Sequence, residues 1–439
     1  MSTQPQPVET TKESPKRDPW TPLFQSQSSF LSDLECIGEM VSVAVPALKN
    51  KDEERTKRID HLAEEIETDK GKTYKIKSAR NAQEAATKAK ELLGHLIKLR
   101  RGDRMFRQGI VITIVSMFDK FLISVLSVCY QQNTGWLKHP DKKISYKELL
   151  EITSLDSIKS EIIQKEIDIL MRDSHHAQLT FLDSQLKLGI EAKFPGWHNF
   201  LEITERRNLF VHTGGRVSLQ YLSSCKRWGI PLDEKIKEEV SLLASEEYIR
   251  KALDCFYELS ARIAQAVARR LFSECFEYAD KELNNRTVEL LTEERWELAE
   301  RIFEYARSIP EDLTSKSEMK YYFLINLCIA RKFSGKPIKE FLHSVDWTPF
   351  HPKYHLAVAV LEERFDEAER LMRNQAVQDE VTEAHFKEWP LLRDFRKTEA
   401  FLNAYSDIYK KDFNQEFLED AEKKIKEQQD DMDNLTSSV

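Results

Sequence analysis

Residues 110–130 form a long, mostly apolar run, and a run of this kind can fold in only two ways. Its 21 residues are enough for a helix that spans a membrane. Asp119 and Lys120 lie at its centre, however, and each would cost about 2.5–3.5 kcal/mol in the middle of a bilayer. We therefore expect a buried helix inside a helical bundle, and no membrane contact.

The composition favours helices along the whole chain. Its 439 residues include only 12 Gly and 14 Pro, and 32% of them are charged, which suits an all-α protein with short connections. The net charge of −8 argues against a protein that coats nucleic acid nonspecifically. Six scattered cysteines without metal-ligand spacing indicate reduced thiols and a cytoplasmic location.

Residues 205–215 combine groups that a helix seldom carries together. Arg207 and Asn208 are followed by three apolar residues and then by His212. Asn is a poor helix former, because its amide competes for backbone hydrogen bonds, and a buried Arg needs partners for five donors. The Gly-Gly pair after Thr213 predicts the end of the helix.

Helical periodicity separates these residues into two stripes. Glu205, Asn208 and His212 follow one another at positions i, i+3 and i+7 and share a polar stripe. Arg207 shares a stripe with apolar residues such as Phe210, so its guanidinium must reach outward from the apolar face. One end of the helix thus carries a base, an amide and a fixed positive charge.

These groups suit cleavage of an RNA phosphodiester by its own 2′-OH, without a metal. Such a reaction needs a base, an acid and a cation on the phosphate. His212 can transfer protons near neutral pH, and Arg207 can grip the phosphate without losing its charge. One histidine cannot be base and acid in the same step, so we expect two chains to face each other in a homodimer.

The same residues resemble a known family. Arg207, Asn208, three further residues and His212 are similar to the Arg-x4–6-His motif of HEPN domains, which occur in RNA-cleaving toxins, phage-defence proteins and RNA-processing enzymes. Residues 116–122, with Asp119 ahead of a Phe-Leu pair, look like the first core helix of that family. The resemblance covers about 165 residues, from 105 to 271.

The resemblance implies a metal-independent endoribonuclease that dimerises through its motif helices, with a role in prokaryotic antiphage defence or as a toxin. Arg207, Asn208 and His212 carry over as catalytic residues. Some HEPN domains are inactive, so a dimeric scaffold that binds a partner stays open as the alternative. Two weaker alternatives are a nucleotide-binding site and a purely structural role, in which Arg207 pairs with Asp119 and His212 caps the helix.

Basic residues near the motif are candidates for RNA binding. Arg101 and Arg104 belong to the densest basic cluster of the chain, and Arg206 and Arg216 flank the motif. A solvated helix face is the default explanation of the cluster, and a rim that contacts phosphates near the dimer cleft is the functional interpretation. The patch 226–228, Lys-Arg-Trp, is a further candidate for stacking on single-stranded RNA, although a core Trp with flanking surface charges is the favoured explanation.

No motif for a cofactor or metal is present. The chain lacks a Walker A loop and the GxGxxG, GxSxG and HExxH patterns. His175 and His176 are adjacent, but they point about 100° apart on a helix and have no further ligands at metal spacing. We therefore expect neither cofactor nor metal.

Apolar residues at helical spacing predict individual helices at 147–152, 158–172, 195–213, 298–306, 321–328, 354–361 and 365–371. A further helix, from 249 to 267, is expected behind an N-cap at Ser245.

The chain divides into five predicted segments. A disordered tail (1–30), a helical hairpin (31–104) and a HEPN-like domain (105–271) precede a helical-repeat-like domain (272–412) and an acidic tail (413–439). The fourth segment resembles tetratricopeptide-type repeats, most clearly in the helix-turn-helix pattern at 356–369. Such regions present grooves to partners, so we expect a protein partner or an antitoxin there.

Overall fold

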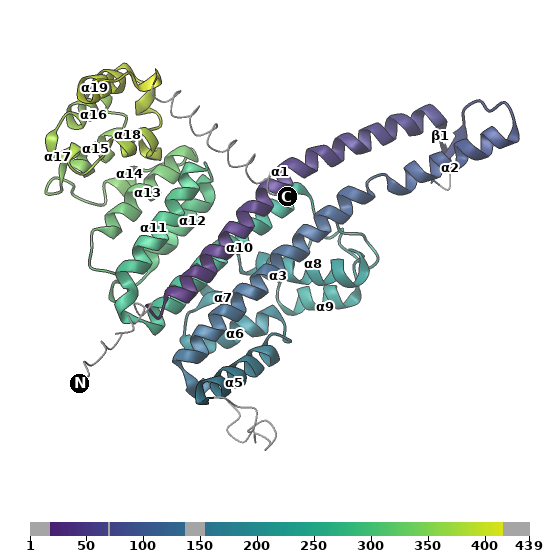
Figure 1. The fold of residues 1–439 in the computed structure, drawn as a ribbon, viewed down its shortest axis with the longest axis horizontal. Helices are drawn as coiled ribbons and strands as arrows, with labels where there is room; N and C mark the ends of the chain where they lie inside the picture. Colours follow the sequence, from purple (N-terminus) through teal and green to yellow (C-terminus); the bar gives the residue numbers. More distant parts are fainter. Residues whose placement is uncertain (1–17, 69–70, 137–153, 416–439) are drawn as a thin grey trace, which may run out of the picture. The chain divides into compact units, whose positions relative to one another are not determined.

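The structure is a computed structural model of the chain, and it describes residues 18–68, 71–136 and 154–415. These residues are mostly helical, as the all-α prediction requires, with one two-stranded sheet among them. The chain divides into two compact units, Met1–Cys275 and Phe276–Val439, which are described separately below (Figure 1).

Four long helices form the core of the first unit. They are α1 (Thr21–Leu62), α3 (Arg101–Gln132), α8 (Trp197–Thr213) and α10 (Glu246–Leu271). Helix α3 packs against the other three, because apolar residues at three- and four-residue spacing run along it. The stretch Ala82–Gln132 is apolar and long enough to cross a membrane, but half of its most apolar window is buried.

Phe118 of α3 joins these helices at the centre of the unit. Its ring lies 6.0 Å from that of Phe30 on α1, 5.5 Å from Phe200 on α8 and 5.0 Å from Phe256 on α10, measured between centroids. All four rings are almost completely buried. Aromatic pairs at these separations add about 0.5–1.5 kcal/mol each beyond their buried area, so the residue beside Asp119 holds the bundle together.

Shorter elements complete the first unit. In chain order they are β1 (Ala63–Thr68), β2 (Gly71–Ile76), α2 (Ala82–Lys98), η1 (Thr134–Trp136), α5 (Leu155–Leu170), α6 (His175–Leu186), α7 (Ile190–Lys193), α9 (Leu219–Arg227) and η2 (Ser273–Cys275). The helices predicted around residues 158–172 and 195–213 are confirmed as α5 and α8. A further helix predicted at 147–152 lies outside the described residues.

The predicted helical hairpin at 31–104 is only partly correct. The C-terminal part of α1 and all of α2 do run together as an arm of the first unit (Figure 1). Their connection, however, is an antiparallel β-hairpin in which Ala63 pairs with Ile76, where continued helices were expected. Thr73, Tyr74 and Ile76 are residue types that favour strands, and the helical pattern concealed them.

The boundaries at the N-terminus also need correction. Residues 21–30, expected in a disordered tail, are the first turns of α1. Leu23, Phe24 and Phe30 are buried there, and the ring of Trp20 packs 6.0 Å from that of Phe272 at the end of α10. This contact spans most of the unit in sequence, so no local pattern could reveal it. The hairpin and the HEPN-like segment are accordingly one compact unit.

Two helix ends that the sequence predicted are confirmed, the C-terminal end of α8 and the N-terminal end of α10. Helix α8 ends at Thr213, and Gly214 adopts a left-handed conformation, with φ of 61°. Gly215 continues it with φ of 95°, and its carbonyl accepts a hydrogen bond from the backbone N–H of Leu242 at 2.8 Å. At the start of α10, the Ser245 side chain accepts the N–H of Tyr248 at 3.1 Å, as a helix N-cap does.

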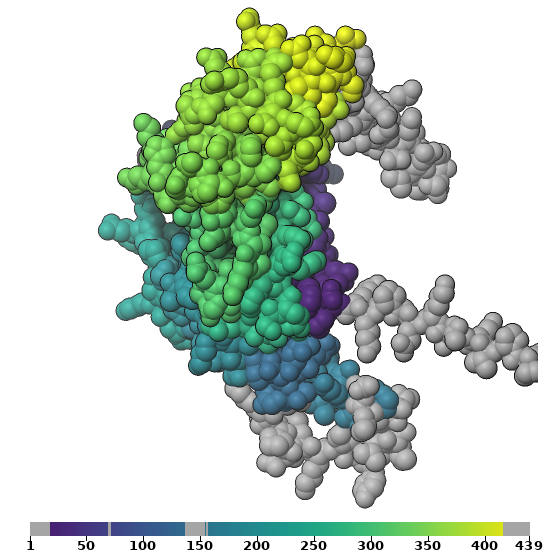
Figure 2. Space-filling model, turned by 90° about the vertical axis from the view of Figure 1, so that its left-hand side faces the viewer, coloured from purple at the N-terminus to yellow at the C-terminus, as the bar shows by residue number. Residues whose placement is uncertain are grey.

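The second unit is a succession of helices that pair with their neighbours. They are α11 (Phe276–Thr292), α12 (Trp296–Ser308), η3 (Glu311–Leu313), α13 (Met319–Phe333), α14 (Lys339–Leu342), α15 (Pro352–Leu361), α16 (Phe365–Met372), α17 (Gln375–Gln378), α18 (Glu383–Glu388), η4 (Pro390–Leu392), η5 (Phe395–Lys397) and α19 (Glu399–Tyr409). The helices predicted at 298–306, 321–328, 354–361 and 365–371 are confirmed. In the space-filling view the described helices of this unit form a continuous surface (Figure 2).

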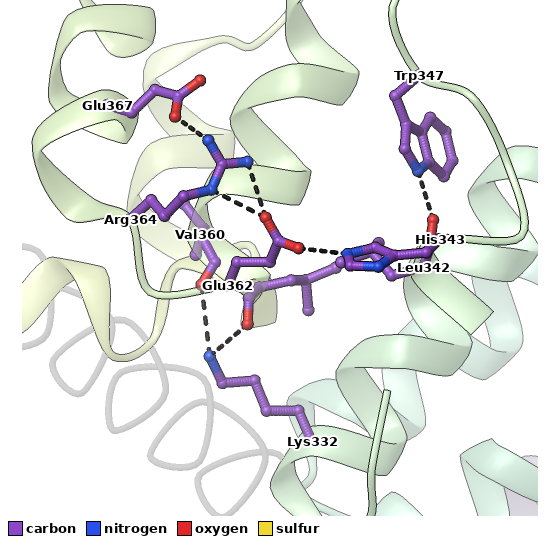
Figure 3. A network of polar contacts seen from close by, with 9 residues as sticks. Lys332, Leu342, His343, Trp347, Val360, Glu362, Arg364 and Glu367 are labelled. Atoms are coloured by element: carbon purple, nitrogen blue, oxygen red, sulfur yellow. Dashed lines mark hydrogen bonds and ion pairs between the residues drawn. The ribbon is translucent and has the colours of Figure 1, made fainter. Parts of the chain in front are cut away.

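The turn between α15 and α16 lies where the sequence predicted a helix-turn-helix junction. Lys332 donates to the carbonyl of Leu361 at 3.0 Å and to that of Val360 at 3.4 Å, which satisfies the end of α15 (Figure 3). Glu362 accepts from Arg364 at 2.9 Å and contacts His343 at 2.7 Å. Polar contacts from α13 and α14 thereby fix the angle of the turn. Of the acidic tail predicted at 413–439, residues 416–439 lie outside the described part.

Replacing Gly215 with Ala should destabilise the first unit more than replacing Gly214. Both positions have left-handed φ values, which cost a residue with a Cβ about 1–2 kcal/mol. Only at Gly215 would the new Cβ also lie 2.8 Å from the backbone oxygen of Leu242. We expect a lower urea midpoint for Gly215→Ala than for Gly214→Ala, and equal midpoints would contradict this account.

Candidate functional site

The candidate site lies where α8 crosses the core helix α3. The two helices run antiparallel, because Asp119 of α3 lies near Arg207, while Gln108, three turns earlier on α3, donates to the carbonyl of Gly214 at 3.0 Å. The predicted stripes are confirmed: Phe210 is buried, Arg207 and Asn208 are half-buried, and His212 is exposed. Helix α3 therefore supports the motif along its whole length.

The Arg207 guanidinium forms fewer hydrogen bonds within the described residues than its five N–H groups allow. Its Nη1 donates to Asn208 Oδ1 at 3.1 Å, and its Nη2 lies 3.9 Å from Asp119 Oδ2, too far for a hydrogen bond. The Nε atom is buried and has no hydrogen-bond partner among the described residues. The side chain is 26% exposed. The structural pairing with Asp119 thus exists, but it leaves the guanidinium able to bind an anion.

His175 belongs to this site, although the sequence gave no reason to place it there. Its Nε2 lies 2.8 Å from Asp119 Oδ1, the shortest contact of that carboxylate with another side chain. The His175 side chain is 11% exposed, and it follows Ser174, whose side chain caps α6. The sequence signal was a histidine beside a helix N-cap, but its partner lies 56 residues away.

His212 stands apart from these contacts. It is exposed in the last turn of α8, and none of the described residues forms a hydrogen bond or ion pair with it. The helix end is satisfied by others: Thr213 Oγ1 donates to the carbonyl of Leu209 at 2.9 Å, and the Gly215 N–H does so at 3.2 Å. The structural alternative expected His212 to cap the helix. It does not do so, and its ring remains accessible.

Arg206 is placed quite differently from Arg207. Its Nε donates to Glu202 at 2.7 Å, and its guanidinium carbon lies 4.3 Å above the ring of Tyr248. Tyr221 and Tyr248 also donate to Glu202, at 2.7 and 2.8 Å. Burial and the Glu202 charge raise the pKa of both tyrosines. The Arg206 side chain is 12% exposed, and its guanidinium is held by these contacts. The geometry therefore gives no support to the predicted contact of Arg206 with RNA.

The remaining RNA-binding candidates are on the surface. Arg101 and Arg104 are exposed and line a groove of about 1010 Å³ between α1, α3 and the segment before α10. The groove also contains acidic residues, among them Asp52 and Glu246, so its charge is mixed. Arg104 lies one turn before Gln108, which places it beside the end of α8. Arg216 forms an exposed ion pair with Glu239 at 2.8 Å.

Glu205, on the polar stripe of α8, is half-buried, and this burial raises the pKa of its carboxyl group. A hydrogen bond with Ser224 of α9 opposes the shift. Nearby, the predicted stacking residue Trp228 already stacks on His176, with ring centroids 3.8 Å apart and planes 17° apart. One face of this indole is therefore occupied by the protein itself.

Thiol and metal chemistry have little support in the described part of the chain. No group of three His, Cys, Asp or Glu side chains converges there as metal ligands would. None of the six cysteines, which all lie within the described residues, forms a disulfide, and five of them are buried. Burial raises the pKa of Cys129 and Cys328 to about 12 and that of Cys225 to about 11, so these thiols stay protonated at neutral pH.

Comparison with known proteins identifies no relative from which a function could be transferred. No family model matches the chain, and neither a curated protein nor a solved structure matches it. The side chains of the candidate site therefore carry the evidence about function.

Replacing each of the two neighbouring arginines should lower the stability of the protein by a different amount. Arg206→Ala leaves the buried Glu202 without its cation, and we expect it to lower the free energy of unfolding by about 3 kcal/mol. Arg207→Ala breaks only a long, partly exposed ion pair, so we expect a loss below about 1 kcal/mol. Urea unfolding monitored by circular dichroism measures both. A larger loss for Arg207→Ala would reverse the assignment.

Proposed function

We propose that this protein is a metal-independent endoribonuclease of the HEPN type, which acts as a cytoplasmic homodimer. The observation that supports this most is that one helix carries both an accessible His212 and, beside Asp119, an Arg207 whose hydrogen-bond donors are not all paired. A structural role would require neither an unpaired guanidinium donor nor an exposed histidine without a partner. The proposal includes a HEPN-like arrangement of the first unit and a repeat-like second unit.

The proposed chemistry is attack of a ribose 2′-OH on the adjacent phosphorus. His212 removes the proton of the 2′-OH as its oxygen bonds to phosphorus, and the 5′-oxygen leaves with a proton from His212 of the partner subunit. Arg207 holds the phosphate and stabilises the charge that builds up on its oxygens. Asn208 orients the Arg207 guanidinium through its Oδ1 atom. The products carry a 2′,3′-cyclic phosphate and a 5′-OH.

The geometry of α8 explains why two chains are needed. His212 follows Arg207 by five residues, which is about 7.5 Å along the axis and about 140° around it. Exposed apolar side chains surround this end of α8: Met105, Val211, Leu219, Val240 and Leu243. We call them the α8-end patch. An apolar patch beside an incomplete site suits a twofold interface that buries it.

Two features suggest how RNA and partners are bound. Arg101 and Arg104 are exposed beside the end of α8, where an RNA strand would leave the site. In the second unit, a groove of about 580 Å³ is lined by Asn284, Asn326 and Trp389, among others. This groove favours the alternative function, a catalytically silent dimer that binds a protein partner or antitoxin. A role in antiphage defence or as a toxin follows from the HEPN resemblance alone.

His212→Ala should abolish RNA cleavage while the fold survives. Losing a general acid or base costs about 10²–10⁴ in rate, and both halves of the dimer lose it here. The measurement is cleavage of mixed cellular RNA in excess EDTA, with analysis of product ends. His198→Ala is the matched control, because His198 is also exposed on α8 but lies about four turns from His212.

Cyclic-phosphate ends made by native protein and the His198→Ala variant, but not by His212→Ala, would support the nuclease. Equal cleavage by His212→Ala and native protein would exclude this histidine from the reaction. No cleavage by any of the three would favour the scaffold.

Val211→Glu should convert the proposed dimer into monomers. Val211 is 49% exposed and directly precedes His212, so a charge there would be buried against its own copy across the twofold axis. Leu93→Glu is the control, because Leu93 is 57% exposed on α2, in the arm. Sedimentation velocity distinguishes the two states, and a dimeric Val211→Glu protein would place the interface elsewhere.

A further inference from the structure

Asp119 divides its carboxylate between two basic side chains from different helices. Its Oδ1 is 2.8 Å from His175 Nε2 on α6, and its Oδ2 is 3.9 Å from Arg207 Nη2 on α8. Because a carboxylate only accepts hydrogen bonds, Nε2 of His175 must be the donor. Asp119 is therefore in closer contact with His175 than with Arg207, and its negative charge compensates Arg207 from a greater distance.

The position of His175 is fixed by its surroundings. Ser174 Oγ accepts the N–H of Ala177 at 3.3 Å at the start of α6, and Gln178 donates to the carbonyl of Asp173 at 2.9 Å in the preceding turn. The imidazole lies beside two core rings that contact each other, with centroids 6.5 Å from Phe118 and 6.1 Å from Phe200. It is almost covered by these contacts, so it cannot itself act on a bound RNA.

We propose that His175 is a positioning residue which, through Asp119, sets the positive charge that Arg207 presents to an RNA phosphate. This proposal rests on the proposed function. When His175 is neutral, Asp119 balances Arg207 and the three groups carry no net charge. When His175 is protonated, its charge balances Asp119 and the three groups carry one positive charge. Affinity for the phosphate is therefore higher in the protonated state.

The charged groups that face His175 support this arrangement. Asp119 lies against it from α3, and from α8 come Arg207, through Asp119, and Glu205, whose carboxyl interacts electrostatically with His175. His176, its neighbour on α6, is instead stacked on Trp228. Two acidic groups therefore face His175, and the net charge of the cluster depends on whether its imidazole carries a proton.

The test measures binding separately from cleavage. The probe is a short, fluorescent single-stranded RNA with 2′-O-methyl riboses, which cannot attack its own phosphates. Fluorescence anisotropy gives its dissociation constant at low and high pH for native protein, His175→Gln and His176→Gln. Gln can still donate to Asp119 but cannot be protonated. Asp119→Asn is a second variant of nearly identical shape, in case His175→Gln fails to fold.

We expect protonation of His175 to strengthen RNA binding about tenfold, as one added charge near the phosphate allows. The ratio of the dissociation constants at high and low pH should therefore be about tenfold smaller in His175→Gln than in native protein and His176→Gln, and the dependence that remains comes from His212 and the other histidines. Asp119→Asn removes the negative charge that balances Arg207, so it should bind RNA more tightly than native protein at high pH, and equal binding there would contradict the proposal. The full pH dependence in His175→Gln, with normal cleavage of ordinary RNA by native protein, would overturn the role of His175 alone. Native protein that neither binds nor cleaves RNA would overturn this proposal together with the proposed function.

Discussion

A carboxylate inside an apolar helix has to be compensated, and Asp119 is compensated by two other helices. His175 and Arg207 approach it from α6 and α8, while Phe118, the residue before it, packs against α1, α8 and α10. The Asp119 side chain is 26% exposed, so these contacts replace only part of its hydration. The charge that argues against a membrane span thus links α3 to α6 through the contact with His175 and to α8 through a longer ion pair, and it brings His175 and Arg207 to one site.

The consecutive residues Arg206 and Arg207 differ in what their side chains do. The contacts of Arg206 stabilise the core, whereas Arg207 belongs to the candidate site. They point about 100° apart, so Arg206 reaches Glu202 and the ring of Tyr248, whereas Arg207 stays at the edge of the core. The first guanidinium is held by a carboxylate and an aromatic face. The second retains an unpaired donor, and this difference in partners makes Arg207 the better candidate for binding a phosphate.

The two units differ in what they offer to other molecules. The first combines an accessible histidine, a partly paired arginine and the α8-end patch, which together suit a reactive site closed by a second copy. The second unit, whose helices pair in sequence, has a groove lined by amides and an indole. Its cluster of His343, Glu362 and Arg364 is paired within itself at the turn between α15 and α16. In the proposed nuclease the first unit reacts and the second recognises a partner, whereas in the scaffold alternative only recognition remains.

The sequence by itself determined the local features of this protein. Helix α8 with its buried and polar stripes, its end at Gly214, the cap at Ser245 and the helices of the second unit all follow from spacing within a few residues. Only the tertiary structure decided that His175 meets Asp119, that Arg206 packs on the ring of Tyr248 and that α1 begins at Thr21 against the end of α10. These contacts join residues far apart in the chain, where a single sequence carries no periodic signal, and the β-hairpin at 63–76 was concealed because its short strands interrupt a longer helical pattern.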